Sequence, residues 1–394
     1  MKINNSNKKI SFGTLLFVIA YTLFLGRVAI GNTTFVEYIS INGITLIFVA
    51  SIALFYIVIK FFTYDRYTVK EMILAGVTII IFLIGYKKST YIDLIILLVL
   101  MVGSKNIKLD TIVKCHFIVY GTITFIALIC ALLGIVENYS TYSILRGYRY
   151  SMGNTYPTDF AAGIFYLVLD FVYIKRDRWK IRYSLGIILL SWSVYYVTDG
   201  NTSFILSCCI AISMIIIKSK NGSKIFNYNF IQNIIICSFP VLAFLSIGIQ
   251  AIYTKVNNSI LYKLDILLNN RLAYGHQAIE KYKLSLFGKR IEFIGAGWGT
   301  SSDSYFYVDN GYLQVALMYG IVILCILCLG FSYVCYKNKL RKNNPVLHLI
   351  IFFIAISGLI EPRFFNILYN SFIFAISIEL FSRKRSFLVK KVNS

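Results

Sequence analysis

Charged side chains are scarce in this sequence: only 14% of the 394 residues are Asp, Glu, Lys or Arg. Hydrophobic residues make up 58%, and the mean hydropathy is +0.72. Ordinary soluble domains are roughly 45–50% apolar, so this composition excludes a soluble globular protein. Internal repeats and low-complexity tracts are also missing. We therefore predict an all-α polytopic membrane protein with a single integral membrane domain over residues 1–394, because apolar runs of about 20 residues indicate helices rather than a barrel.

A cysteine framework is missing as well. All eight cysteines lie in or at the ends of apolar runs, where free Cys behaves as a small hydrophobic side chain. Cys325 and Cys328 form a C-x-x-C pair, but it lies in an apolar run and no second pair accompanies it. This spacing predicts packing rather than zinc or redox chemistry, and we expect neither a metal site nor a disulfide.

Apolar runs that approach spanning length predict about 12 transmembrane helices. Their approximate cores are residues 12–29, 41–62, 72–85, 91–102, 112–136, 158–174, 183–197, 203–217, 230–252, 312–335, 346–360 and 364–381. The first run exceeds the roughly 7–15 residues of a signal h-region, so we interpret it as a retained helix, with a secretory signal as the alternative. The third and fourth runs, and the seventh and eighth, are short pairs whose connecting turns are expected to dip toward a cavity open to the outside.

Basic residues outnumber acidic ones by 39 to 17, and they concentrate in the connectors between apolar runs. This pattern is typical of the positive-inside rule and does not indicate nucleic-acid binding. It predicts that both termini are cytoplasmic. The loop of residues 253–304, between the ninth and tenth helices, is then a large extracytoplasmic loop.

Five arginines fall on the predicted outer face, and arginine suits phosphate because its planar fork donates hydrogen bonds in pairs and stays charged. They are Arg146, Arg149, Arg271, Arg290 and Arg363. Headgroup contacts or salt bridges with nearby glutamates are the alternative interpretation. Tyrosines in the same loops fit an interfacial aromatic belt, although their rings also suit sugars. Together the five arginines favour an anionic substrate.

Two outer-face residues are candidates for a general base. Asp309 and Asn310 stand directly before the tenth predicted helix, where one of them is expected to be the N-cap. A carboxylate at the membrane surface would have a raised pKa and could accept a proton from a hydroxyl group. His276 is the other candidate, with an ordinary surface histidine as the alternative interpretation.

Four segments resemble motifs of the Wzy-type polysaccharide polymerases, which belong to the O-antigen ligase and polymerase superfamily. They are RGYRYSMGNTYPTDFAA at residues 146–162, VTDGNTSFIL at 197–206, NNRLAYGHQAI at 269–279 and GAGWGTSSDSYFYVDNGYLQVALMYGIV at 295–322. Each motif is loose alone, whereas their order and predicted sidedness are more specific. The resemblance extends to the helix layout over nearly the whole chain.

This resemblance implies a glycosyltransferase of the bacterial plasma membrane that works on its outer face. Such an enzyme transfers a glycan from an undecaprenyl-diphosphate-linked donor to a lipid-linked acceptor, which polymerises repeat units of capsule, O-antigen or exopolysaccharide. It implies no metal and no other cofactor, with a flippase and a chain-length regulator as candidate protein partners. Arg271 matches the family's loop arginine, and Asn310 belongs to the helix-opening motif as a substrate-binding residue.

Two departures from the family pattern concern this site. The ligases have histidine where this chain has Asp309, so Asp309 and His276 both stay candidates for the catalytic base. Relatives commonly carry a Ser-Arg pair where Gly200 and Asn201 stand here, and Arg146 or Arg149 is expected to replace the missing arginine.

Two other functions remain as alternatives. A ligase-like glycan transferase would use the same donor, and a lipid-linked oligosaccharide flippase would share the helix count. A flippase is expected to line its path with charges in mid-helix, whereas Asp170 and Glu379 are nearly the only carboxylates well inside the apolar runs.

The predicted topology is testable by labelling single cysteines with a membrane-impermeant reagent in a cysteine-free background. We expect Ser285→Cys, in the large loop, to react from outside the cell, and Lys180→Cys to react only after the membrane is opened, because basic connectors stay inside. Labelling of position 180 but not 285 in intact cells would invert the topology.

Overall fold

The computed structural model describes residues 11–39, 43–143, 146–219, 222, 226, 228–254, 260–295, 306–341 and 345–381. This part of the chain contains 15 α-helices and one two-stranded antiparallel hairpin, β1 (Ser140–Ser143) with β2 (Gly147–Tyr150). The predicted all-α class is therefore confirmed.

Within the described ranges, eight helices are long and apolar enough to cross a bilayer. They are α1 (Phe12–Gly31), α2 (Gly43–Thr63), α3 (Val69–Ser89), α5 (Leu109–Leu132), α6 (Pro157–Lys175), α8 (Asn201–Lys218), α10 (Asn229–Ala251) and α14 (Ile321–Leu340). The chain is thus a multi-pass membrane protein. The prediction of about 12 spanning helices is wrong.

The remaining helices are shorter or more polar. They are α4 (Ile92–Gly103), α7 (Ile181–Thr198), α11 (Ile260–Leu267), α12 (Arg271–Tyr282), α13 (Gly311–Met318), α15 (Val346–Ser357) and α16 (Phe374–Leu380). Only one member of the first predicted short pair is short, because α3 continues over 21 residues to Ser89. The helix begins at Val69, before the predicted residue 72. A capping box stabilises this start: Thr68 and Glu71 each accept a hydrogen bond from the other's backbone amide.

The predicted helix over residues 312–335 is broken into α13 and α14 at Gly320. This residue has φ of 99°, and a Cβ there would lie 2.3 Å from the carbonyl oxygen of Leu286. The backbone amides of Ile321 and Val322 donate to the carbonyls of Ser285 and Leu286, at 3.0 and 3.1 Å. The large loop therefore replaces the helical bonds lost at the break, which only glycine permits at this close approach.

The predicted helix over residues 364–381 is also wrong. The structure has two short 3-10 helices, η4 (Pro362–Phe365) and η5 (Ser371–Ile373), before α16. Irregular backbone at membrane depth is tolerated where protein surrounds and satisfies it. Buried side chains of α5 and α6 hold this segment in place: His116 Nε2 donates to the backbone carbonyl of Leu368 at 2.9 Å, and Asp170 accepts from the side-chain hydroxyl of Ser371 at 2.7 Å. His116 and Asp170 also bond to each other, at 2.5 Å.

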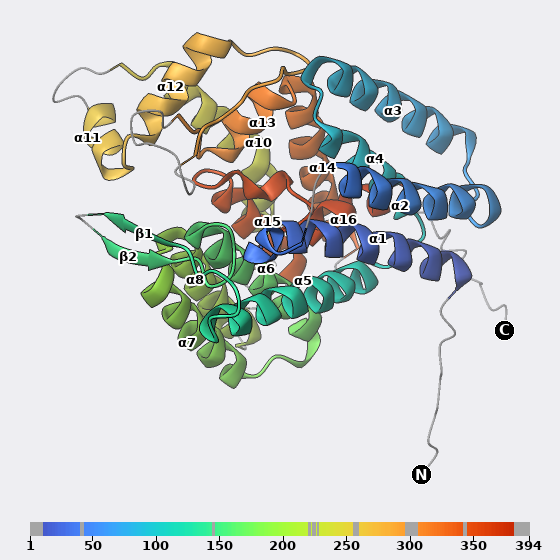
Figure 1. Ribbon diagram of the computed structural model, residues 1–394. Coiled ribbons are helices and arrows are strands. Elements are labelled where there is room, and N and C mark those ends of the chain that lie inside the picture. Colours follow the sequence, from blue (N-terminus) through green and yellow to red (C-terminus); the bar gives the residue numbers. More distant parts are fainter. Residues whose placement is uncertain are drawn as a thin grey trace.

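Helix α6 lies at the centre of the bundle, with 72% of its spanning window buried, whereas α2 and α3 are only 17% buried and form the periphery. The β1–β2 hairpin and helices α11 and α12 lie at the same end of the molecule, at the left of Figure 1. The candidate site is formed by residues of four elements, α6, α12, α13 and η4.

The break at Gly320 generates a stability prediction. We expect Gly320→Ala to lower the free energy of unfolding by more than about 1 kcal/mol, because the methyl group meets backbone and the positive φ disfavours an L side chain. Thermal unfolding of the purified protein measures the effect. Gly76→Ala on α3 is the matched control, since nothing lies within 4 Å of a Cβ there; an equal melting temperature for the two variants would contradict the prediction.

Candidate functional site

Helix α13 begins at a cap that fixes the position of Asp309. Asn310 is the N-cap: its Oδ1 accepts from the backbone amide of Leu313 at 2.9 Å, and its Nδ2 donates to the carbonyl of Leu359 at 2.9 Å. The next amide, that of Gly311, donates to the carbonyl of Gly358. Asp309 does not cap the helix, and its carboxylate is left to face Arg271.

Arg271 and Asp309 form an ion pair at the start of α12. The Nε of Arg271 lies 3.0 Å from Oδ2 of Asp309, and its Nη1 donates to the carbonyl of Ile360 at 3.2 Å. The two side chains are 33% and 26% exposed, so the pair is half-buried and open on one side. Two residues predicted for the site from separate motifs are thus brought into direct contact.

Arg363, on η4, is held more deeply. Its guanidinium contacts Asp159 Oδ1 at 2.7 Å and Glu361 Oε2 at 3.2 Å, and also donates to the hydroxyl of Thr158 at 3.0 Å. Arg363 and Glu361 are each only 14% exposed, and Asp159 is 20% exposed. The salt bridge with Glu361, one of the alternatives for this arginine, is present, and a second carboxylate joins it.

We call Arg271, Arg363, Asp159, Asp309 and Glu361 the arginine–carboxylate cluster. With every group ionised it carries one more negative than positive charge. Burial raises the pKa of both Asp309 and Glu361, and the positive charges of Arg271 and Arg363 oppose that rise. Burial lowers the pKa of Arg363, but its carboxylate neighbours outweigh burial and raise that pKa overall. The cluster therefore combines two arginines with two carboxyl groups, those of Asp309 and Glu361, whose affinity for a proton is increased.

The hairpin arginines lie apart from the cluster. Arg149 donates from Nε to the carbonyl of Thr198 at 2.8 Å, and Arg146 lies 3.5 Å from Asp199. Both therefore contact the turn between α7 and α8. That turn approaches the cluster through α8, where the hydroxyl of Ser203 lies 3.5 Å from Glu361. Arg146 is 36% exposed at its side chain and remains open to a ligand.

Two other predicted site residues are placed elsewhere. Arg290 stacks on the ring of Tyr91, 5.0 Å from its centroid, and is 55% exposed beside Glu292. His276 donates from Nδ1 to the carbonyl of Gln250 at 3.0 Å, and its Nε2 lies 3.5 Å from Glu280. In the described parts of the chain, no contact joins His276 to Asp309.

Sequence reasoning missed part of this site. Asp159, in the first turn of α6, was not among the predicted site residues, yet it receives Arg363 and a hydrogen bond of 3.1 Å from Tyr369. Tyr307 also lies near the cluster: burial raises its pKa, as do the charges of Asp309 and Asp159. Asp159 lies within the motif of residues 146–162, but the local sequence does not show that Arg363 faces it. The glycine-rich part of the fourth motif, residues 296–305, lies outside the described residues.

A metal centre finds no support in the ranges that the structure describes, where no group of three His, Cys, Asp or Glu side chains is arranged to hold an ion. The side chains of the cluster themselves offer two kinds of chemistry. Arginines bind and stabilise anions, and a carboxylate of raised pKa accepts a proton.

The two arginines of the cluster are expected to differ in what their loss does. Arg363→Ala leaves two poorly exposed carboxylates without their cation, and breaking such a pair costs about 3–5 kcal/mol, so the yield and melting temperature of folded protein should fall sharply. Arg271→Ala removes a half-exposed partner and should leave a folded protein. Size-exclusion profiles and thermal unfolding of the two variants measure this, and normal stability of Arg363→Ala would exclude a structural role.

Comparison with protein-family models, with curated proteins and with solved structures finds no match to this chain. Similarity therefore assigns neither a family nor a function. The features that bear on function are the geometry and charge of the cluster, the predicted sidedness of the chain, and the motifs that contain Arg271 and Asp309.

Proposed function

We propose that this protein is a membrane glycosyltransferase that polymerises undecaprenyl-diphosphate-linked oligosaccharide repeat units on the outer face of the plasma membrane. The observation that carries the proposal is the half-open pair of Arg271 and Asp309, a cation for the leaving diphosphate beside a carboxyl group of raised pKa. A transferase needs both functions within one site. The two residues come from two of the four motifs on which the resemblance depends.

Arg271 is suited to the donor diphosphate. Its guanidinium carries five N–H groups in a planar fork. Protein partners are seen for Nε and Nη1 in the described residues, and the side chain is one-third exposed. The remaining N–H groups can donate to phosphate oxygens, where negative charge develops as the sugar–oxygen bond breaks.

Asp309 is suited to activate the acceptor. In the proposed step an acceptor hydroxyl oxygen forms a bond to the anomeric carbon of the donor while the bond from that carbon to the diphosphate oxygen breaks. The hydroxyl proton passes to Asp309, and undecaprenyl diphosphate leaves with the electron pair. Because burial raises the pKa of Asp309, the carboxylate is a stronger base than an exposed aspartate, and the charges of Arg271 and Arg363 limit that rise.

A negatively charged cluster is a poor binding site for a dianion unless further cations join it. Arg146 is the best placed described candidate, because it is partly exposed and contacts the α7–α8 turn that reaches Glu361 through Ser203. Arg363 has its guanidinium engaged by two carboxylates, so its role is to position the loop that carries Glu361 and Ile360. A ligase-like transferase would use the same groups with another acceptor.

A lipid-linked oligosaccharide flippase is the second candidate, favoured by the buried pair of His116 and Asp170 between α5 and α6. Ionisable groups inside spanning segments often line a transport path. Here both residues also bond to the irregular C-terminal segment, at Leu368 and Ser371. This use of both partners supports a structural role and places transfer ahead of transport.

Asp309→Asn tests the proposed base. The substitution preserves shape and does not touch the helix cap, which Asn310 forms, so the protein should insert and fold normally. If Asp309 accepts the proton, polymer formation from purified lipid-linked repeat units should fall by roughly 10²–10⁴-fold. His276→Ala is the parallel variant: normal activity in Asp309→Asn with loss in His276→Ala would transfer the role to the histidine, and unchanged activity in both would leave the site without a base.

Arg271 is tested by comparing Arg271→Ala with Arg271→Lys. We expect polymer to be abolished in the first and little restored in the second, because the ammonium of lysine is a point charge that cannot reproduce the paired fork. Arg290→Ala is the control, since this exposed arginine stacks on Tyr91 away from the cluster and should retain activity. Full polymer from Arg271→Ala at normal protein level would refute diphosphate binding by this residue, whereas accumulation of unflipped donor on the inner leaflet would favour the flippase.

A further inference from the structure

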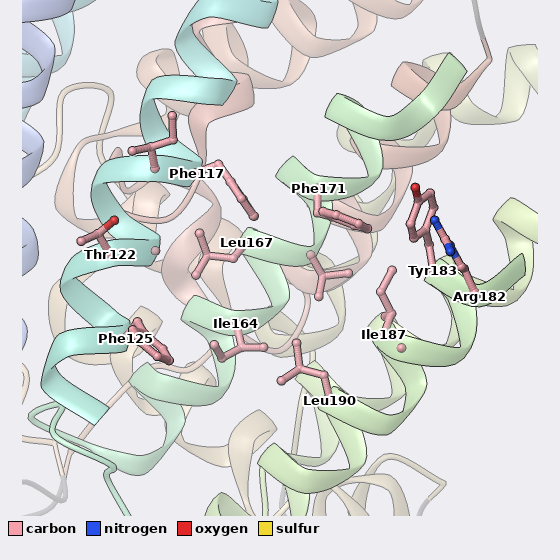
Figure 2. Close-up of a pocket in the computed structure, with 14 residues that line it drawn as sticks. Phe117, Thr122, Phe125, Ile164, Leu167, Phe171, Arg182, Tyr183, Ile187 and Leu190 are labelled. Carbon is pink, nitrogen blue, oxygen red and sulfur yellow. The ribbon is translucent and has the colours of Figure 1, made fainter. Parts of the chain in front are cut away.

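A second cavity does not include any residue of the arginine–carboxylate cluster. It is a groove of about 650 Å³ between α5, α6 and α7 (Figure 2). Phe117 and Phe125 of α5 line one side, Leu167 and Phe171 of α6 form the floor, and Leu190 of α7 lies on the opposite side. This volume is within the range of sites that bind small organic ligands, about 300–1,000 Å³.

Two glycines leave the groove open. Gly186 stands on the α7 side, and nothing lies within 4 Å of a Cβ built there. Gly121 stands on the α5 side, where a Cβ would meet only Leu167 at ordinary contact distance, 3.6 Å. The groove is therefore a space left by missing side chains between packed helices, with an almost entirely apolar lining.

Positive charge gathers at one end of the groove. Arg182, in the first turn of α7, is a lining residue, and its guanidinium lies 5.5 Å from the ring centroid of Tyr183. Residues 175–182 contain five basic side chains and only one acidic side chain, Asp177. In Figure 2, Arg182 and Tyr183 lie on the α7 side, at the end away from Phe125. An apolar groove with a cationic mouth is complementary to a lipid with an anionic headgroup.

The direction of the helices separates this mouth from the candidate active site. Helix α6 begins at Pro157 and carries Asp159, the partner of Arg363, in its first turn. It ends at Lys175, in the basic segment that precedes Arg182. Helix α7 begins at Ile181 and ends at Thr198, whose carbonyl receives Arg149. The cationic mouth and the cluster are thus at opposite ends of the bundle, so one lipid cannot place a single headgroup at both.

The length of the groove matches one leaflet. From Arg182 to Leu190 the helix rises about 12 Å, at 1.5 Å per residue. One leaflet contributes half of the roughly 30 Å hydrocarbon core, or about 15 Å. A chain that enters from the Arg182 end is therefore accommodated within the leaflet on that side.

We propose that this groove is a binding site for an anionic glycerophospholipid, with one acyl chain between α5 and α7 and its phosphate at Arg182. The site is distinct from the proposed donor site and does not depend on the proposed transfer reaction. The bound lipid fills the space between α5 and α7, beside the central helix α6. It thereby stabilises the packing of α7 on the bundle.

Lipid retention tests the proposal. The full-length protein is reconstituted in phosphatidylcholine bilayers that contain phosphatidylglycerol as a minor component, and is then released into mild detergent for native mass spectrometry. We expect the wild type to retain phosphatidylglycerol. Gly186→Trp fills the groove and should lose this lipid, whereas Gly76→Trp, at an equally open glycine of α3, should retain it.

The headgroup contact is tested without filling the groove. Arg182→Gln should lower the preference for phosphatidylglycerol over phosphatidylcholine about fivefold, the effect of one basic residue at an anionic surface. Because this variant leaves the apolar lining intact, it decides the question even where Gly186→Trp fails to fold. An unchanged preference in Arg182→Gln, or equal retention in a folded Gly186→Trp, would overturn the proposal.

A competition experiment separates the phospholipid from the polyprenyl donor. Undecaprenyl phosphate, added at the concentration of phosphatidylglycerol, should not displace it from the wild type. Displacement would overturn the assignment, because the groove would then take the isoprenoid chain. Loss of transfer activity in the Arg271 variants with normal retention of phosphatidylglycerol would show that the two sites are independent.

Discussion

The ion pair between Arg363 and Asp159 is the contact on which the arrangement of the arginine–carboxylate cluster depends. It joins η4, in the irregular C-terminal segment, to the first turn of the central helix α6. Charges with little access to water are stable only when they are paired and hydrogen-bonded, and Arg363 also meets Glu361 and Thr158. The carbonyl of Ile360, in the same loop, accepts from Arg271. The position of the half-open pair thus follows from the buried one.

The hydrophobic pattern was sufficient to predict the fold class and the positions of most spanning helices. It failed where backbone geometry rather than composition decides. An apolar run with one glycine reads as a continuous helix, yet at Gly320 the carbonyls of residues 285 and 286 replace the helical partners, and this contact is remote in sequence. The run over residues 364–381 failed similarly, because the side chains that hold this irregular segment lie on α5 and α6. His116 bonds to the backbone carbonyl of Leu368, and Asp170 bonds to the hydroxyl of Ser371.

The candidate site was predictable only in part, because its contacts also join residues that are remote in sequence. Arg271 and Asp309 were named from separate motifs and lie 3.0 Å apart. Local rules left the choice of cap between Asp309 and Asn310 open, and the structure resolves it, because only Asn310 also reaches the carbonyl of Leu359. Sequence separation hid the partners of Arg363: Asp159 is 204 residues away, and nothing local indicates that a carboxylate in a helix's first turn has a cation opposite it.

The raised pKa of Asp309 and the contact with Arg271 have opposite effects, and their balance matters for a base. Burial disfavours the carboxylate and raises its pKa overall, whereas the charges of Arg271 and Arg363 favour the ionised form and limit that rise. A bound diphosphate would compete for the same guanidinium and weaken its contact with Asp309. Removal of that contact raises the pKa of Asp309 further, which makes the carboxylate a stronger proton acceptor only when the donor is present. The same arginine can thereby couple binding of the leaving group to activation of the acceptor, which a lysine in its place would do less well because it lacks the fork that serves both partners at once.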